Sequence, residues 1–275
     1  MRSQRRDGDE GLNRPYRTYT TYNRILLALA LTLTVLLGSV PMLRAALRFT
    51  IPDLLTSRQL IIVLADDWAA TSARVQRFER SKRTDHDWHP VGPTFSAVLG
   101  TNGLAWGIGL HGTGVPGDPV KQEGDRRSPA GVFQLAQAFG QFRSGHPPFW
   151  HWPYEQVVAT TLAIDDPKSR YYNRIVDLRS VPDPDWQHVE WMQQVGGEYQ
   201  CGVVVKHNWD QIPGRGSCIF LHVWSSPDHT TAGCTAMSES DLMELLRWLD
   251  QDKRPLLVQL PNATYQRLRQ DWVLP

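Results

Sequence analysis

The sequence predicts a mainly β domain, β-sandwich-like with mixed sheets, and a few helices. Short apolar runs of strand length recur along the chain, and turn signals such as Thr101-Asn102-Gly103 separate them. A helical period is clear only near the C-terminus, where leucines recur three, four and seven residues apart, at Leu242, Leu245, Leu246 and Leu249. No linker, repeat or low-complexity tract divides residues 52–275, so we expect one domain there.

The first half of this domain is predicted to contain four strands. Residues 60–64 form an apolar run typical of a buried strand, and the polar-rich residues 73–79 are expected to form a second strand. A third strand is predicted at residues 88–98, interrupted at Gly92-Pro93, and a fourth at residues 132–135. The Gly- and Pro-rich segment between them, residues 103–131, is predicted to be a long ordered loop, either the edge of a cleft or a surface turn.

The second half alternates strands with helices. Residues 157–164 and 203–205 are predicted strands, and residues 186–195 are predicted to form a short helix. Ser238-Glu239-Ser240-Asp241 has the form of a capping box and opens the leucine-patterned helix. Pro255 ends that helix, and residues 256–260 are the last predicted strand.

The first 45 residues differ in character from the rest. Residues 1–24 are polar, lack apolar periodicity and are predicted to be a disordered basic tail with six arginines. Residues 25–45 are predicted to be a signal peptide or a membrane anchor, because residues 25–43 carry no charge. The absence of a clear cleavage site favours an anchor in the inner membrane, with the tail inside and the body exported to the periplasmic side.

The charge of the body argues against one class of partner. Residues 1–24 hold six Arg and three acidic residues, which leaves 23 basic and 25 acidic residues in the remainder. A protein that binds nucleic acid needs a clustered basic footprint. We therefore expect no nucleic-acid partner.

The three cysteines, Cys201, Cys218 and Cys234, leave at least one thiol unpaired or intermolecular. A Cys201–Cys218 disulfide is open, because a hairpin around residues 212–214 would place Cys201 opposite Leu221 or His222.

A cysteine and a histidine form the candidate catalytic pair. The apolar run of residues 218–221 leads to His222, and Gly233-Cys234 follows on a polar loop twelve residues later. A thiol needs a rigidly held base to become a good nucleophile, and this arrangement can supply one. The alternatives are a buried inert thiol beside a structural histidine, or a metal site that includes His229. The metal site is disfavoured, because the spacing matches no familiar ligand pattern.

This segment resembles the catalytic domain of the L,D-transpeptidases of bacterial cell walls. The signature of that family is a histidine at a strand end, a loop, and Ser/Thr-x-Gly-Cys, which correspond here to His222 and Thr231-Ala232-Gly233-Cys234. Further similar segments extend the resemblance over roughly residues 60–260. They are Lys121-x-Glu123-Gly124-Asp125, Ser128-Pro129-Ala130-Gly131-Val132-Phe133, Asp165-Asp166-Pro167, Tyr171-Tyr172-Asn173 and the stretch from Gly216 to Trp224.

The resemblance implies a role for each residue of the motif. Cys234 would be the nucleophile and His222 the general base, oriented by the backbone carbonyl of Val223. Backbone N–H groups around Gly233 and Cys234 would form the oxyanion hole. The donor would be a peptidoglycan stem tetrapeptide, attacked at the carbonyl before its terminal D-alanine to give a thioester. An amine of another stem or water would then resolve that thioester, and no metal or organic cofactor is needed.

The chain departs from the family at the residues that would grip the substrate. Better-known members carry an Arg soon after the cysteine, where this chain has Thr235-Ala236-Met237. Loss of that Arg removes bidentate recognition of a carboxylate. The candidate substitutes are Lys121, Arg126 and Arg127, and the other predicted substrate contacts are Thr231, Thr235 and Trp224.

Two other activities stay open at this point. One is a hydrolase that trims stem peptides through the same acyl-enzyme, and the other is a non-catalytic envelope module that binds peptidoglycan. For catalysis we expect the Cys234 sulfur within roughly 3 to 4 Å of a His222 ring nitrogen.

Overall fold

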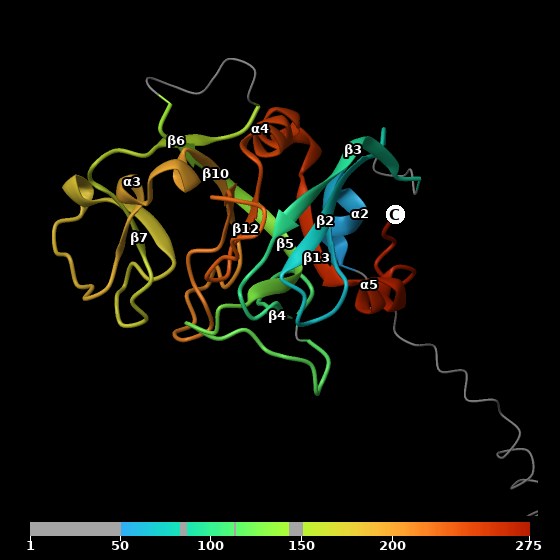
Figure 1. Cartoon of the computed structure of the whole chain (residues 1–275), viewed down its shortest axis with the longest axis horizontal. Coiled ribbons are helices and arrows are strands. Elements are labelled where there is room, and N and C mark those ends of the chain that lie inside the picture. Colours follow the sequence, from blue (N-terminus) through green and yellow to red (C-terminus); the bar gives the residue numbers. More distant parts are fainter. Residues whose placement is uncertain (1–50, 83–86, 113, 143–150) are drawn as a thin grey trace, which may run out of the picture. The chain divides into compact units, whose positions relative to one another are not determined.

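A mixed ten-stranded sheet closes on itself in the computed structural model, which describes residues 51–82, 87–112, 114–142 and 151–275. The strand pairings run β10-β11-β12-β3-β2-β1-β13-β5, and β5 pairs again with β10. The strands of this ring are β1 (Gln59–Ala65), β2 (Ser72–Glu79), β3 (His89–Val98), β5 (Ser128–Gly140), β10 (Cys201–Val205), β11 (Phe220–Val223), β12 (Thr235–Met237) and β13 (Leu256–Pro261). Two short strands, β4 (Leu104–Trp106) and β6 (Tyr154–Gln156), extend it from β5 (Figure 1).

A separate three-stranded sheet is formed by residues between β6 and β10. Its order is β8 (Arg174–Asp177), β7 (Thr161–Ile164) and β9 (Glu190–Trp191). The described helices are α2 (Pro52–Thr56), α3 (Met192–Val195), α4 (Glu239–Trp248) and α5 (Asn262–Leu268), with 3₁₀ turns at Leu178–Ser180, Gly196–Tyr199 and Gln251–Lys253. In Figure 1, β7 and α3 lie at one end of the folded domain and α5 lies toward the other end.

The prediction of a mainly β fold with mixed sheets and few helices is confirmed. The pairs β1–β13 and β11–β12 are parallel, whereas β1–β2 and β2–β3 are antiparallel. The closure into a barrel is a detail that the sandwich-like prediction did not contain. It depends on β5, whose residues 131–134 pair with β13 and whose residues 135–140 pair with β10. Only residues 132–135 of this long strand were predicted.

The core explains why several elements could be recognised. The parallel neighbours β1 and β13 are buried along almost their whole length, which accounts for their continuous apolar runs. Helix α4 buries Leu242, Leu245 and Leu246 against the sheet, as its period predicts. The Ser238 hydroxyl accepts a hydrogen bond from the Asp241 N–H at 3.1 Å, so the predicted cap is present.

The predicted helix of residues 186–195 and the predicted strand of residues 157–164 are both shorter in the structure. Residues 186–195 are helical only at Met192–Val195, because Glu190 and Trp191 pair with Ala163 and Leu162 of β7. Residues 157–160 precede β7 as a turn in which the Val158 N–H donates to the Thr161 hydroxyl at 2.9 Å. Glu190 therefore lies on a strand.

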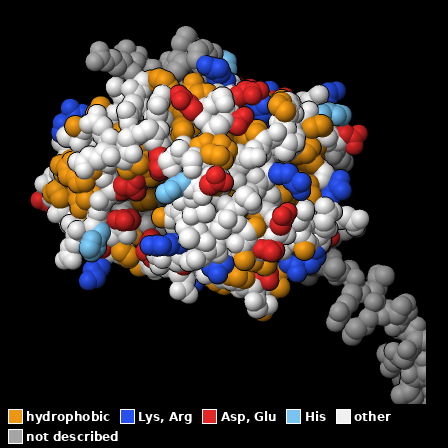
Figure 2. Space-filling model, in the orientation of Figure 1, with side chains coloured by type: hydrophobic (Ala, Val, Ile, Leu, Met, Phe, Trp, Pro, Cys, Tyr) orange, Lys and Arg blue, Asp and Glu red, His pale blue; other side chains and the backbone are white. Residues whose placement is uncertain are grey.

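The predictions for residues 1–45 lie outside the described residues. Within the described part of the chain, none of the helices combines the length and the apolar character needed to cross a membrane. On the face that Figure 2 shows, basic and acidic side chains are interspersed.

Candidate active site

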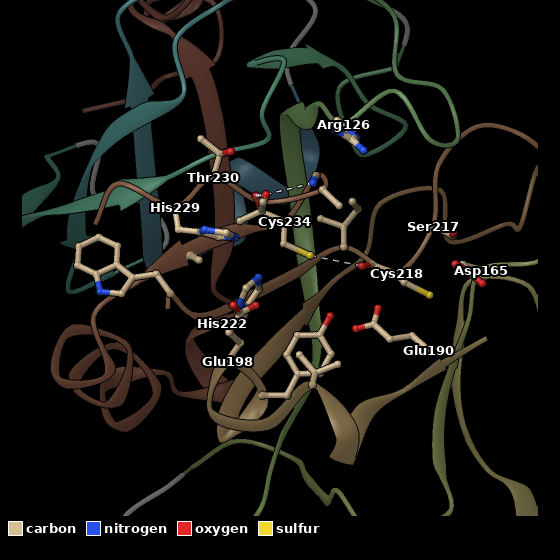
Figure 3. A pocket seen from close by; sticks show the side chains of 18 of the residues that line it. Arg126, Asp165, Glu190, Glu198, Ser217, Cys218, His222, His229, Thr230 and Cys234 are labelled. Atoms are coloured by element: carbon tan, nitrogen blue, oxygen red, sulfur yellow. Dashed lines mark hydrogen bonds between the residues drawn. The ribbon is translucent and has the colours of Figure 1, made fainter. Parts of the chain in front are cut away.

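A cavity of about 560 Å³ lies where β11 and the start of β12 run side by side. Both His222 and Cys234 line it (Figure 3). Its remaining lining comes from the loop of residues 121–126, from residues 217–219, from the loop of residues 224–233 and from the region of β9 and Tyr199. The predicted pair thus shares one cavity and does not lie on opposite faces of the sheet.

Strand alternation positions His222. Its neighbours Leu221 and Val223 belong to the main hydrophobic core, so the imidazole between them projects from the other face of the strand. The parallel register sets His222 beside Ala236, and Cys234 comes just before β12 begins at Thr235. Two adjacent strands therefore deliver the base and the thiol to the same cavity.

The imidazole of His222 is held in one orientation. Its Nδ1 atom lies 2.8 Å from the backbone carbonyl oxygen of Val223, which can only accept, so Nδ1 carries the proton. The Tyr199 ring meets the His222 ring edge-on, with centroids 5.4 Å apart and planes at 79°. Burial lowers the pKa of His222, against the opposing effects of the Val223 bond and of Glu198. The ring is therefore neutral, with a lone pair on Nε2.

The thiol of Cys234 is also neutral at rest. Its sulfur accepts a hydrogen bond from the Phe220 N–H at 3.3 Å, and the thiol donates to the Cys218 carbonyl oxygen at 3.5 Å. Burial raises the pKa of Cys234 to about 12, although the Phe220 N–H acts in the opposite direction. Among the described residues no hydrogen bond joins His222 to Cys234, so their approach to 3 to 4 Å stays a prediction.

The loop before the thiol is tied together by hydroxyl groups. The Thr231 hydroxyl donates to the Cys234 carbonyl oxygen at 2.7 Å and accepts from the Gly233 N–H at 3.1 Å. The Ser128 hydroxyl donates to the same Cys234 carbonyl at 2.7 Å and accepts from the Gly100 N–H at 2.9 Å. Gly233 has φ +148°, a conformation that favours glycine. The Gly233 N–H, a predicted oxyanion donor, is therefore already engaged.

Four of the six residues suggested as substrate contacts line the cavity, namely Thr231, Trp224, Lys121 and Arg126. Thr231 uses its hydroxyl within the loop. Lys121 is 3% exposed, and its ammonium group is bound to Asp125 and to the Gln122 carbonyl. Arg126 is exposed, and its guanidinium has no partner among the described residues, which makes it the available cation.

The predicted role of Thr235 in substrate binding is wrong. Its side chain is 1% exposed and does not line the cavity. Its hydroxyl donates to Gln259 Oε1 at 2.7 Å, and Gln259 Nε2 donates to the Pro129 carbonyl at 2.9 Å. Thr235 is thus part of the packing between β12, β13 and β5. Arg127, another suggested substitute for the missing Arg, donates to the Leu104 carbonyl at 2.9 Å.

Several cavity residues were missed by sequence reasoning. Tyr199 is 5% exposed and packs edge-on against the His222 ring, and Glu190 and Glu198 also line the cavity. Glu190 was not predicted as a site residue because it was assigned to the helix of residues 186–195. Tyr199 was not predicted because it belongs to no recognised motif. Cys218 was noted only for a disulfide, and its left-handed backbone, φ +53°, is held by the Asn173 side chain, which accepts from the Cys218 N–H at 2.9 Å.

The cysteines are all free thiols, and β10 pairs Gly202 with His222, which places Cys201 away from Cys218. In the described part of the chain no three His, Cys, Asp or Glu side chains form a group that could hold a metal ion. The alternative metal site that includes His229 therefore gains no support.

Comparison with known families agrees with this geometry. A model of the L,D-transpeptidase catalytic domain matches residues 117–258, more than half of the chain. The chain belongs to the L,D-transpeptidase catalytic-domain family. No curated protein matches it. The part that matches the L,D-transpeptidase domain contains His222, Cys234 and the loop of residues 121–126.

Proposed function

We propose that this L,D-transpeptidase domain acts on peptidoglycan stem peptides through a thioester formed on Cys234. The observation that carries the proposal is the shared cavity of His222 and Cys234, with the His222 ring fixed by the Val223 carbonyl. Family membership supplies the substrate class, and the cavity supplies a thiol, a base and room for a peptide. The product would be a cross-linked or remodelled cell wall.

Acylation begins from neutral partners. The thiol proton, directed at rest to the Cys218 carbonyl, turns to Nε2 of His222 as the sulfur attacks the carbonyl carbon before the terminal D-alanine. The C–S bond forms, the amide C–N bond breaks, and the proton on Nε2 passes to the leaving amine of D-alanine. Because a pKa of about 12 disfavours a resting thiolate, proton transfer must accompany the attack.

The developing oxyanion needs N–H donors. We propose the Cys234 N–H as the primary donor, because the Gly233 N–H is bound to Thr231 at rest. The Gly233 N–H contributes only if that bond yields when substrate enters. The exposed Arg126 is the proposed partner of a donor carboxylate, since Lys121 is already paired.

Resolution of the thioester decides between the transferase and the hydrolase. An amine gives a cross-link and water gives a trimmed tripeptide. The test is to incubate the full chain with a tetrapeptide stem and an amine-bearing acceptor stem, and to separate the products. We expect release of D-alanine and a cross-linked product, both absent in Cys234→Ala and His222→Ala. Release of tripeptide alone would support the hydrolase, and no release by the wild-type chain would favour a binding module.

The substrate class also bears on location. We propose that residues 25–43 anchor the chain in the inner membrane and that the domain acts on the periplasmic side, since the body must reach the wall. A reporter enzyme that is active only outside the cytoplasm, fused after Pro275, tests this. Activity supports export, and an inactive but intact fusion argues against it.

A further inference from the structure

We propose that the Glu190 carboxylate binds the incoming amine of the acceptor and takes its first proton. This inference rests on the proposed thioester. It identifies the residue that would favour attack on that thioester by an acceptor amine over attack by water. Glu190 would be a specificity-determining residue for the second half of the reaction.

The fold places Glu190 at the cavity wall. The pairing of Glu190 with Ala163 fixes β9 against β7, and the side chain reaches the cavity that Cys234 lines. In Figure 3, Glu190 and Arg126 lie on opposite sides of Cys234. The guanidinium of Arg126 and the carboxylate of Glu190 therefore flank Cys234, and Lys121, Glu123, Asp165 and Glu198 also line the cavity.

Tyr199 connects this carboxylate to the candidate base. Its ring packs edge-on against the ring of His222, and its hydroxyl group lies close enough to Glu190 to lower the pKa of that carboxylate. Further edge-on contacts with Phe139 and Phe220, at centroid distances of 5.5 and 5.6 Å, hold the Tyr199 ring in place. Glu190 is therefore separated from the imidazole by one well-packed side chain, close to where a second substrate must approach the thioester.

The charge of Glu190 is unsuited to activating the nucleophile. Its negative charge raises the pKa of Cys234, whereas Lys121 lowers it. Glu190 therefore does not help to form the thiolate of Cys234. A carboxylate in a cavity can instead bind the ammonium group of the acceptor. Burial, together with Asp165 and Glu198, raises the pKa of Glu190 itself, which makes the carboxylate a stronger proton acceptor.

The acceptor ammonium gives one proton to the Glu190 carboxylate and becomes a free amine. Its nitrogen attacks the thioester carbon, the C–N bond forms, and the C–S bond breaks. Nε2 of His222 takes the second amine proton and returns it to the leaving sulfur of Cys234. Glu190 then releases its proton to solvent.

The experiment compares full-length wild type, Glu190→Gln, Glu190→Asp and Glu155→Gln. Glu155 is a matched control, because it is a partly buried carboxylate with a raised pKa that does not line this cavity. Each variant receives a tetrapeptide donor with an amine-bearing acceptor stem or with the same stem acetylated on that amine. Intact mass gives the rate of thioester formation, and product separation gives the ratio of transfer to hydrolysis.

We expect Glu190→Gln to acylate at least as fast as the wild type, because the substitution removes a charge that raises the pKa of Cys234, while its transfer-to-hydrolysis ratio falls by roughly tenfold or more. The acceptor KM should rise, Glu190→Asp should restore part of the ratio, and Glu155→Gln should leave it unchanged. An unchanged ratio in Glu190→Gln overturns the inference, as does parallel loss of acylation and transfer. A wild-type thioester that only water resolves overturns it while leaving the proposed acyl-enzyme intact. Absence of any thioester overturns both.

Discussion

The Nδ1 atom of His222 lies 2.8 Å from the carbonyl oxygen of Val223, the next residue in the chain. The contact selects the tautomer that leaves Nε2 as the basic nitrogen, without a carboxylate partner. A neutral carbonyl orients the ring without adding the full charge that would raise its pKa strongly. Burial also lowers the pKa of His222 below its ordinary value, so the ring is unprotonated at neutral pH.

This relationship predicts the acid limb of the pH–rate profile. The active form needs neutral His222, and its folded pKa lies below the ordinary 6.5, so activity should persist as pH falls below 6.5. The measurement is kcat/KM for D-alanine release against pH. A limb centred at or above pH 6.5 would show that the imidazole is not buried as described or is not the base.

A second prediction concerns the hydroxyl of Thr231. Thr231→Val removes its bonds to the Cys234 carbonyl and the Gly233 N–H while keeping the shape of the side chain. We expect the rate of thioester formation to fall by about 10- to 100-fold, because the sulfur and the backbone N–H of Cys234 lose their fixed position.

Thr230→Val is the control for this loop, since the Thr230 hydroxyl contacts the exposed Thr101 hydroxyl at 2.9 Å. Stopped-flow acylation rates of the two variants should separate clearly. Equal rates for both would mean that the Thr231 hydroxyl does not organise the nucleophile.

A third prediction links two buried histidines to acid stability. The Nδ1 atoms of His111 and His207 accept from the Val132 and Ile108 N–H groups, so both rings must be neutral. Burial lowers the pKa of His111 to about 4 and that of His207 to about 3. The unfolded chain binds these protons first, so this stability is complete above pH 6.5 and falls as pH drops below it.

At pH 5 each imidazole should lower the free energy of unfolding by about 2 kcal/mol relative to pH 7.5. Glu155 and Glu190 oppose this slightly, because their pKa values are raised in the folded state. Urea unfolding at the two pH values measures the difference. His207→Gln should reduce the pH dependence, and a stability that rises toward pH 5 would refute this assignment.

A fourth prediction follows from the buried pair of Thr235 and Gln259. Thr235→Val leaves Gln259 Oε1 without its donor inside the protein and should cost about 1–3 kcal/mol of unfolding free energy. Denaturant titration measures that cost. A loss of substrate affinity in the folded variant, without a loss of stability, would restore the predicted role in binding.

A feature could be predicted from the sequence when residues close to it in the chain determine it. The strands β1 and β13 and the start of helix α4 follow from local periodicity and capping, and they were predicted close to their observed positions. The predicted end of the helix at Pro255 is wrong, because α4 ends at Trp248 and a separate 3₁₀ turn follows at Gln251–Lys253. That His222 and Cys234 lie near one another was also accessible, because only the end of β11 and one short loop separate them in sequence.

Features set by distant partners were not predicted. Nothing local to Gln134 and Leu135 indicates that β5 stops pairing with β13 there, begins pairing with β10 and so closes the barrel. Glu190 was placed on a helix because its pairing with Ala163 is invisible in its own segment. Thr235 and Lys121 were proposed as substrate contacts by their nearness to motifs, but their partners Gln259 and Asp125 occupy them within the fold.

The central claim is that Cys234 carries the acyl group. The most direct measurement is the intact mass of the full chain after brief exposure to a tetrapeptide stem. We predict one added tripeptide acyl group on the wild type and on Cys218→Ala, whose thiol lines the same cavity, and none on Cys234→Ala. A wild-type chain that never gains this mass, or an adduct that survives Cys234→Ala, would contradict the account.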